Sequence, residues 1–284
     1  MNGLKVGDIV VRKSYGSDVY FKIVDIITKG GGKSVYILKG LFYRIEADSD
    51  GEDLVKQDSR KASIDIEKNV RGAKNNMYRK EALSTLASRA GMSLFQRLSL
   101  MPGRVLHIDA DEEFLNMCLK HYKEHRIPAI GKLAKESEQP AIVRGLLAKY
   151  RPNIVVMTGH DSLKKNADKN DINSYKNSKY FIEAARVARS FEPDPDKLCI
   201  FSGACQTFFE KVMENGANFA SSPGRVLINA LDPAFVSQKI ALTDHRTVVT
   251  PEKVAELTIS GSKGIGGIKT KGQLRSRYPL FGYR

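Results

Sequence analysis

The sequence predicts an α/β fold in which a mostly parallel sheet carries helices on both faces and follows a small β-barrel. From Gly103 onward, short apolar segments typical of strands alternate with longer segments of helical periodicity. Before residue 56, short β-branched and aromatic segments follow one another with turn residues between them. The chain has 284 residues, 42% of them hydrophobic, which is enough for a sizeable core and for more than one domain.

Residues 1–55 are assigned to a small barrel of SH3-like type. Strands are expected at 8–11, 19–24, 35–38 and 42–45. Glycine-rich and Asp/Ser-rich turns separate them, and short strands at this spacing are typical of a small closed barrel. A β-hairpin extension packed on the main domain fits the same pattern.

Residues 56–102 form a basic connector, rich in Lys, Arg, Asn and Ser. A weak helical signal at 81–87 is compatible with a solvated helix pair. The segment carries the arginines Arg60, Arg71, Arg79, Arg89 and Arg97.

Residues 103–284 are assigned to the α/β domain. The expected strands are 104–108, 128–130, 154–158 and a segment that ends just before Cys205, and the expected helices are 111–125, 139–150, 180–190 and 208–214. The glycine-rich run 260–269 has neither a Walker pattern nor GxGxxG after a strand, so we expect a flexible loop and no nucleotide site there.

Charge and cysteine usage limit the function classes. The net charge of +14 predicts affinity for polyanions, but no finger, homeodomain or aromatic-rich motif indicates a specific nucleic-acid reader. No apolar segment is long enough to span a membrane and no signal-peptide core begins the chain, so we expect a cytosolic protein. The three cysteines have no regular spacing, which favours free thiols over a disulfide framework or a zinc site.

Two side chains follow apolar strands directly and form the candidate site. His160 comes after Ile154–Thr158 and Gly159, and Cys205 comes after an apolar run and Gly203-Ala204. Ligands of parallel sheets bind beyond the carboxyl ends of the strands, so both side chains are expected at that edge. A cysteine at a helix start would have a lowered thiol pKa, because unpaired N–H groups and the helix dipole favour the thiolate.

The remaining cysteines and histidines are expected to be structural or solvated. Cys118 and Cys199 lie inside apolar patterns typical of a core. His107 lies in a strand, His121 and His125 lie on a helix, and His245 lies in a polar loop.

The site resembles that of the caspase-like cysteine peptidases, in which one hydrophobic strand ends at the catalytic His and the next at Ala-Cys. Here the matching residues are Gly159-His160 and Ala204-Cys205-Gln206, with His160 45 positions before Cys205, against roughly 50 in caspases. The resemblance implies a caspase-like or flavodoxin-like sheet. Gly203 replaces the Gln or acidic residue that often stands two before the Cys, and Gly159 precedes His160 where these enzymes have a following Gly.

Over nearly its whole length the sequence also looks like the YabG family of sporulation-specific proteases of spore-forming bacteria. This resemblance implies a cysteine endopeptidase of the mother-cell cytoplasm that associates with the forming spore coat. It implies spore coat and cortex-associated proteins as substrates, and cleavage after arginine. Because the connector 56–102 is rich in arginine, self-cleavage within it is expected.

In this mechanism Cys205 is the nucleophile and His160 the general base. Gly159 and Ala204 would contribute to the oxyanion hole and its geometry, and Asp161 would orient the imidazole. An arginine pocket needs a carboxylate, for which Asp232 is the first candidate and Asp171 the second. No metal or cofactor is required.

Two readings from other classes stay open. The acidic cluster Asp109, Asp111, Glu112 and Glu113 after a strand resembles that of a receiver domain, a signalling module that binds Mg²⁺. A receiver needs a phosphoacceptor Asp at the end of its third strand, where this chain has Thr158-Gly159-His160. A noncatalytic coat-assembly protein that uses its basic surface is the other alternative.

Overall fold

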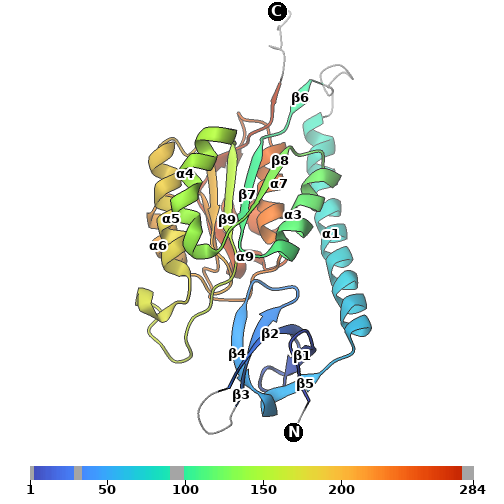
Figure 1. The fold of residues 1–284 in the computed structure, drawn as a ribbon. Helices are drawn as coiled ribbons and strands as arrows, with labels where there is room; N and C mark the ends of the chain where they lie inside the picture. The colour runs from blue at the N-terminus through green and yellow to red at the C-terminus, as the bar shows by residue number, and fades with distance from the viewer. Residues whose placement is uncertain (1–2, 29–33, 90–98, 277–284) are drawn as a thin grey trace, which may run out of the picture.

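The computed structural model describes residues 3–28, 34–89 and 99–276. It has an N-terminal β unit and a larger α/β unit, with the long helix α1 (Ser59–Arg89) running from the first along the side of the second (Figure 1). The α/β content and the mostly parallel sheet predicted from the sequence are confirmed.

The N-terminal unit is a five-stranded antiparallel sheet in the order β4-β3-β2-β1-β5. Its strands are β1 (Ile9–Arg12), β2 (Phe21–Thr28), β3 (Ser34–Gly40), β4 (Glu46–Asp50) and β5 (Leu54–Lys56). Val10, Ile23 and Leu38 are fully buried in its small core. Strands β4 and β5 are the two edges of the sheet, so the closed SH3-like form stays a prediction.

The expected strand at 42–45 is wrong as a member of this sheet. The segment leaves it after Gly40, where an added Cβ would lie 2.6 Å from the carbonyl oxygen of Tyr43, so the tight turn needs glycine. Tyr43 instead forms an antiparallel bridge with Asn229, and Ile45 a parallel bridge with Asp161. The β-forming residues therefore pair with the α/β unit.

The connector is helical as far as the structure describes it. Helix α1 has 31 residues and a length of about 46 Å at 1.5 Å per residue. Met77 is buried in the main core, and Lys74 lies 2.7 Å from Glu124. The side chains of α1 that the structure describes are mostly exposed, and the helix sequence is basic, which explains why it shows little apolar periodicity.

The α/β unit has a six-stranded sheet in the order β13-β11-β10-β9-β7-β8, in which only the β11–β13 pair is antiparallel. The strands are β7 (Val105–Asp109), β8 (Ala129–Leu133), β9 (Ile154–Thr158), β10 (Cys199–Ser202), β11 (Phe219–Ser221) and β13 (Ile265–Gly267). The central strands β7, β9 and β10 are buried along their whole length, as expected for a sheet covered on both faces.

Helices cover both faces of this sheet (Figure 1). One face carries α4 (Gln139–Tyr150), α5 (Ser178–Phe191) and α6 (Phe209–Glu214), and the other carries α3 (Glu112–Glu124) and α7 (Asp232–Leu242) with α1 outside them. Phe181 is buried on the first face and Phe235 on the second. Two hydrophobic cores therefore sandwich the sheet.

The glycine-rich run near the C-terminus is ordered structure, so the expectation of a flexible loop was wrong. It forms α9 (Gly261–Gly264) and the edge strand β13. A Cβ on Gly267 would lie 2.4 Å from the carbonyl oxygen of Asn218, and one on Gly266 would lie 2.7 Å from the Phe209 ring. The glycines permit close packing.

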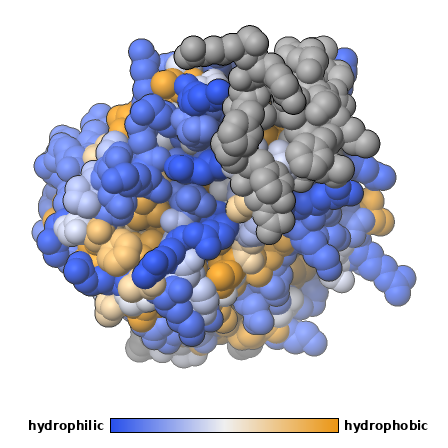
Figure 2. Space-filling view, turned by 90° about the horizontal axis from the view of Figure 1, so that it is seen from above, coloured by the Kyte–Doolittle hydropathy of each residue, from blue (hydrophilic) through white to orange (hydrophobic). Residues whose placement is uncertain are grey.

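The remaining described elements are short. They are β6 (Leu100–Met101), β12 (Val248–Val249), α8 (Pro251–Ala255), β14 (Thr270–Lys271), β15 (Arg275–Ser276) and the 3-10 turns η1 (Lys13–Tyr15), η2 (Gly51–Asp53), η3 (Glu136–Glu138) and η4 (Ile172–Ser174). None of the helices within the described ranges is long and apolar enough to cross a membrane. Seen from the end opposite the β unit, the described surface is largely hydrophilic, with hydrophobic residues in small groups (Figure 2).

Candidate active site

The carboxyl ends of β7, β9 and β10 lie at the edge of the sheet that faces the N-terminal unit (Figure 1). Met157 of β9 pairs with Ser202 of β10. His160 and Cys205 each lie three residues beyond this pair, so the two chains leave the sheet at the same level. Adjacent strands are about 4.8 Å apart, which puts the two side chains in neighbouring loops, as the sequence predicts.

Cys205 lies in a turn before α6, whose first helical residue is Phe209. The expected position at a helix start was therefore wrong. The side chain is fully buried, and burial raises the thiol pKa well above its usual range. In this arrangement Cys205 is a neutral thiol.

The hydrogen bonds of Cys205 are all with backbone groups. Its Sγ accepts the N–H of Ile228 at 3.0 Å and lies 3.7 Å from the carbonyl oxygen of the same residue. Its own N–H donates to the carbonyl oxygen of Arg44 at 3.3 Å. The backbone N–H of the candidate nucleophile is thus hydrogen-bonded to Arg44, a residue of the N-terminal unit.

His160 is held by two carboxylates. Its Nε2 lies 3.2 Å from Oδ2 of Asp111 and its Nδ1 3.8 Å from Oε1 of Glu136, while its N–H donates to the same Glu136 oxygen at 2.8 Å. Burial lowers the pKa of His160, but the two carboxylates outweigh burial and the pKa is raised. The polar contacts of the ring are with these carboxylates and do not include the Cys205 thiol.

Asp161 does not contact the imidazole through the hydrogen bonds that the structure gives it. Its Oδ1 accepts the N–H groups of Ser162 and Asn177, and its Oδ2 accepts the hydroxyls of Ser178 and Thr207. Burial raises its pKa to about 6 although these bonds lower it. Asp161 thus anchors the loops around the site.

Small residues allow the close approaches in these loops. A Cβ on Gly159 would lie 2.4 Å from Oε1 of Glu136, so glycine lets that carboxylate reach the His160 amide. Ala204 is buried, and its N–H donates to the Thr207 hydroxyl at 2.9 Å. Gly203 has a φ of 117°, which a side chain would strain.

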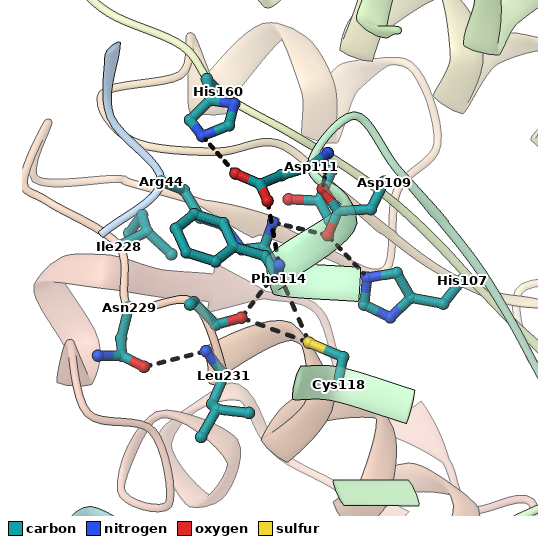
Figure 3. A network of polar contacts seen from close by, with 12 residues as sticks. Arg44, His107, Asp109, Asp111, Phe114, Cys118, His160, Ile228, Asn229 and Leu231 are labelled. Carbon is teal, nitrogen blue, oxygen red and sulfur yellow. Dashed lines mark hydrogen bonds and ion pairs between the residues drawn. The ribbon is translucent and has the colours of Figure 1, made fainter. Parts of the chain in front are cut away.

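A fully buried ion pair joins the two units (Figure 3). Nη1 of Arg44 lies 2.8 Å from Oδ2 of Asp109, and Nη2 donates to the carbonyl oxygen of Ala230 at 2.8 Å. Asp109 also contacts Nε2 of His107 at 3.3 Å, and the guanidinium lies 5.2 Å from the centre of the Phe114 ring. Burial raises the pKa of Asp109, but the Arg44 charge and the His107 contact together outweigh burial and the pKa is lowered.

The two aspartates of the acidic cluster noted in the sequence pair with basic side chains in this structure. Asp109 pairs with Arg44, and Asp111 pairs with His160 and with Lys39, whose Nζ lies 2.5 Å away. These contacts give the receiver-like interpretation no support, because the carboxylates that would hold Mg²⁺ already have cationic partners.

The two arginine-pocket candidates lie in different surroundings. Asp232 is fully buried, and burial raises its pKa to about 6. Its carboxylate accepts the N–H groups of Asn229, Ile259 and Ser260, so it organises backbone. Asp171 is exposed and caps η4 through the N–H of Asn173.

Within the described ranges, one group of side chains could hold a metal ion: His121, Glu124 and His125, whose ligand atoms lie within 4.8 Å of one another. Nε2 of His121 contacts Gln238, and Glu124 pairs with Lys74. This group lies on α3, apart from the His160 and Cys205 loops, and supplies no ligand to them.

Neither candidate catalytic side chain lines a surface hollow found beside α6. That hollow, of about 580 Å³, is lined by residues that include Lys169, Glu210 and Arg225. A thiol and an imidazole at adjacent strand ends can perform nucleophilic acyl transfer. In this structure both side chains are buried, and Arg44 of the N-terminal unit is buried against the same edge of the sheet.

The partners Arg44, Asp109, Asp111 and Glu136 were missed as site residues by sequence reasoning. The two aspartates were visible only as an acidic cluster after a strand. Glu136 follows β8, which neighbours β7 in the sheet, so the same strand-end rule could have found it. Nothing in the sequence around Arg44 distinguishes it from the other arginines.

Comparison with known proteins agrees with a peptidase. The family model described as YabG peptidase U57 matches residues 5–279. The sporulation-specific protease YabG of Bacillus subtilis (strain 168) is 40% identical over 283 residues, which cover 97% of this chain and 98% of that protein. No solved structure matches the chain.

Proposed function

The chain belongs to the YabG peptidase U57 family, and on that premise we propose that it is a cysteine endopeptidase with Cys205 as nucleophile and His160 as general base. A sporulation-specific peptidase is what the family supports. The catalytic class and residues are the proposal.

One observation carries the proposal: a peptide carbonyl already lies on the N–H of Cys205. The Arg44 carbonyl accepts this N–H at 3.3 Å, beside a thiol that follows a buried strand. In acyl transfer, the N–H of the nucleophile is a natural donor to the developing oxyanion, and such a donor contributes roughly 3 kcal/mol to transition-state stability. The neighbouring loop supplies the imidazole.

The reaction needs the two side chains to come together. The Cys205 proton passes to His160, and the sulfur forms a bond to the scissile carbonyl carbon. The C–N bond then breaks, the leaving amine takes the proton from His160, and water hydrolyses the thioester. For this, His160 must exchange its Asp111 contact for the thiol.

We further propose cleavage after arginine, with spore coat and cortex-associated proteins as substrates, in the mother-cell cytoplasm at the forming coat. Burial of Arg44 next to Cys205 supports the arginine preference. The substrates and the location rest on the family resemblance drawn from the sequence, and the relative's name supports only a sporulation-specific protease.

Self-cleavage in 56–102 also stays a proposal. Arg60, Arg71, Arg79 and Arg89 lie in α1, where helical backbone must unwind before a protease can bind it, and Arg97 lies outside the described residues. Intact-mass measurement of the wild type beside Cys205→Ala tests it, since only the wild type should lose the N-terminal unit.

The test of the proposed function is cleavage of an arginyl peptide and of a basic coat protein by purified variants. Cys205→Ala and His160→Ala should each abolish cleavage with an unchanged circular dichroism spectrum. Cys199→Ala is the matched control, because this thiol is buried in the core and its loss should leave activity in place. Full activity in Cys205→Ala would overturn the mechanism. A wild type that cuts nothing would favour the noncatalytic coat-assembly alternative.

A further inference from the structure

A charged side chain from one unit is completely buried in the other. Arg44 has 0% of its surface exposed, and an arginine is seldom buried unless its charge is paired. Its pocket provides the Asp109 carboxylate, the Ala230 carbonyl oxygen and the face of Phe114 (Figure 3). Nε of Arg44 is buried without a hydrogen-bond partner, so the pocket satisfies the guanidinium incompletely.

The backbone around Arg44 is bound as an added strand. The Arg44 N–H donates to the carbonyl oxygen of Ile228 at 2.9 Å, and the Ala230 N–H donates to the carbonyl oxygen of Phe42 at 2.9 Å. The bridge between Tyr43 and Asn229 lies between these bonds and is antiparallel. Extended peptides bind proteins in this way, with main-chain bonds giving affinity and pockets for alternate side chains giving specificity.

The same segment aligns a peptide bond with the candidate nucleophile. Ile228, which pairs with Arg44, also donates its N–H to Sγ of Cys205 at 3.0 Å. The Arg44 carbonyl accepts the Cys205 N–H, so the bond between Arg44 and Ile45 lies next to the thiol. The guanidinium pocket, the added strand and the contact with the Cys205 amide are together what a bound substrate with arginine before the scissile bond would show.

We propose that residues 42–45 are an internal pseudosubstrate, that Arg44 fills the pocket for the substrate arginine, and that Asp109 is the carboxylate that selects it. This inference rests on the proposed function and adds its specificity residue and its regulation. Asp109 is preferred to Asp232 and Asp171, because it is the carboxylate that contacts a guanidinium inside the pocket.

The described conformation is then a latent one. A tethered segment competes with substrate at high effective concentration and needs only modest affinity to keep the pocket filled. The enclosed neutral thiol and the ion pair between His160 and Asp111 agree with this state. A substrate must displace residues 42–45 before the imidazole and thiol can act.

A merely structural ion pair predicts something different. Removing Arg44 would then only destabilise the chain, and nothing else would recognise the space. The pseudosubstrate proposal requires the vacated space to bind a guanidinium from solution and the thiol to become more accessible. Both consequences can be measured on the full-length chain.

The first experiment measures thermal unfolding of Arg44→Ala with methylguanidine, and with methylamine as the cation control. Methylguanidine should raise the midpoint of Arg44→Ala but not of the wild type, and Asp109→Asn in the Arg44→Ala background should remove the shift. Arg12→Ala is the matched control, because Arg12 also pairs with a carboxylate, Asp53, within the N-terminal unit. Equal shifts in all four chains would overturn the proposal.

The second experiment measures labelling of Cys205 by an arginyl acyloxymethyl ketone peptide. Arg44→Ala should be labelled at least about tenfold faster than the wild type, the gain expected if the filled pocket leaves fewer than about one molecule in ten competent. Arg44→Lys, which keeps a charge opposite Asp109, is the second variant if Arg44→Ala does not fold, and it too should label faster. Arg12→Ala should label at the wild-type rate. Equal rates in wild type and both Arg44 variants would overturn the proposal.

The two proposals fail in different ways. If methylguanidine binds Arg44→Ala but no probe ever modifies Cys205, the proposed catalytic residue is wrong and the guanidinium pocket stands. If Cys205 is labelled equally in every chain and no guanidinium binds, the cysteine peptidase stands and the pseudosubstrate is refuted.

Discussion

Replacement of Asp109 by asparagine should destabilise the protein strongly. The change keeps the size of the side chain and an oxygen acceptor for Arg44, but it removes the negative charge. Arg44 would then remain buried at 0% exposure without a directly paired charge, since its other hydrogen bonds are with a neutral carbonyl and a thiol.

The magnitude follows from the geometry. At the observed 2.8 Å, two unit charges attract by about 6 kcal/mol at an effective dielectric constant of 20. Measured losses on breaking one side of a buried pair are about 3–5 kcal/mol. Because asparagine still accepts a hydrogen bond, we expect about 3 kcal/mol, which lowers the melting temperature by about 6–12 °C in a chain of this size.

Urea unfolding at neutral pH, followed by circular dichroism, measures the change. The matched control is Asp53→Asn, whose partner Arg12 is partly exposed, and which should cost no more than about 1 kcal/mol. The double variant Arg44→Met with Asp109→Asn removes both charges and should recover most of the loss. A loss below about 1 kcal/mol for Asp109→Asn, or a double variant as unstable as the sum of both single changes, would refute a dominant charge interaction.

Three further predictions concern pH, specificity and metals. Because the pKa of His160 is raised in the folded protein, the charged imidazole stabilises the fold at low pH, and this contribution is lost as pH rises through that pKa. In urea unfolding, His160→Gln should therefore lower the free energy of unfolding more at pH 6 than at pH 9. An equal loss at both pH values would contradict the ion pair with Asp111. Asp232→Asn should leave the ratio of arginyl to neutral peptide cleavage unchanged, because the Asp232 carboxylate binds backbone N–H groups. A lower ratio would show that Asp232, and not Asp109, selects the substrate arginine. EDTA should leave peptide cleavage unchanged, and a loss that zinc restores would point to His121 and its neighbours on α3.

Sequence reasoning located the α/β strands well because each is a short apolar run between turns. Strands β7, β9 and β10 begin and end within about two residues of the expected positions, since their burial on both faces leaves little choice of residue. The strand-end rule also brought His160 and Cys205 to the same edge, and the pairing of Met157 with Ser202 explains why it works.

The features that the sequence could not show are those that depend on which distant part of the chain a segment contacts. Phe42-Tyr43-Arg44-Ile45 has strand-forming residues whether it pairs inside the N-terminal sheet or with residues 228–230. Glycines in 260–269 look the same whether they provide flexibility or close packing. The carboxylates that hold His160 come from two other loops, and no local pattern brings them together.

The position of Arg44 along the chain also fixes an order in time. It precedes Asp109 by 65 residues and Ala230 by 186, so a ribosome completes the N-terminal unit long before the groups that neutralise this guanidinium exist. Until residue 230 has emerged, the Ala230 carbonyl and the strand pairing of residues 42–45 with residues 228–230 cannot form. By the time the thiol of Cys205 is in place, the segment that blocks it has already been made, so synthesis leaves no interval in which an open peptidase meets the rest of the cell.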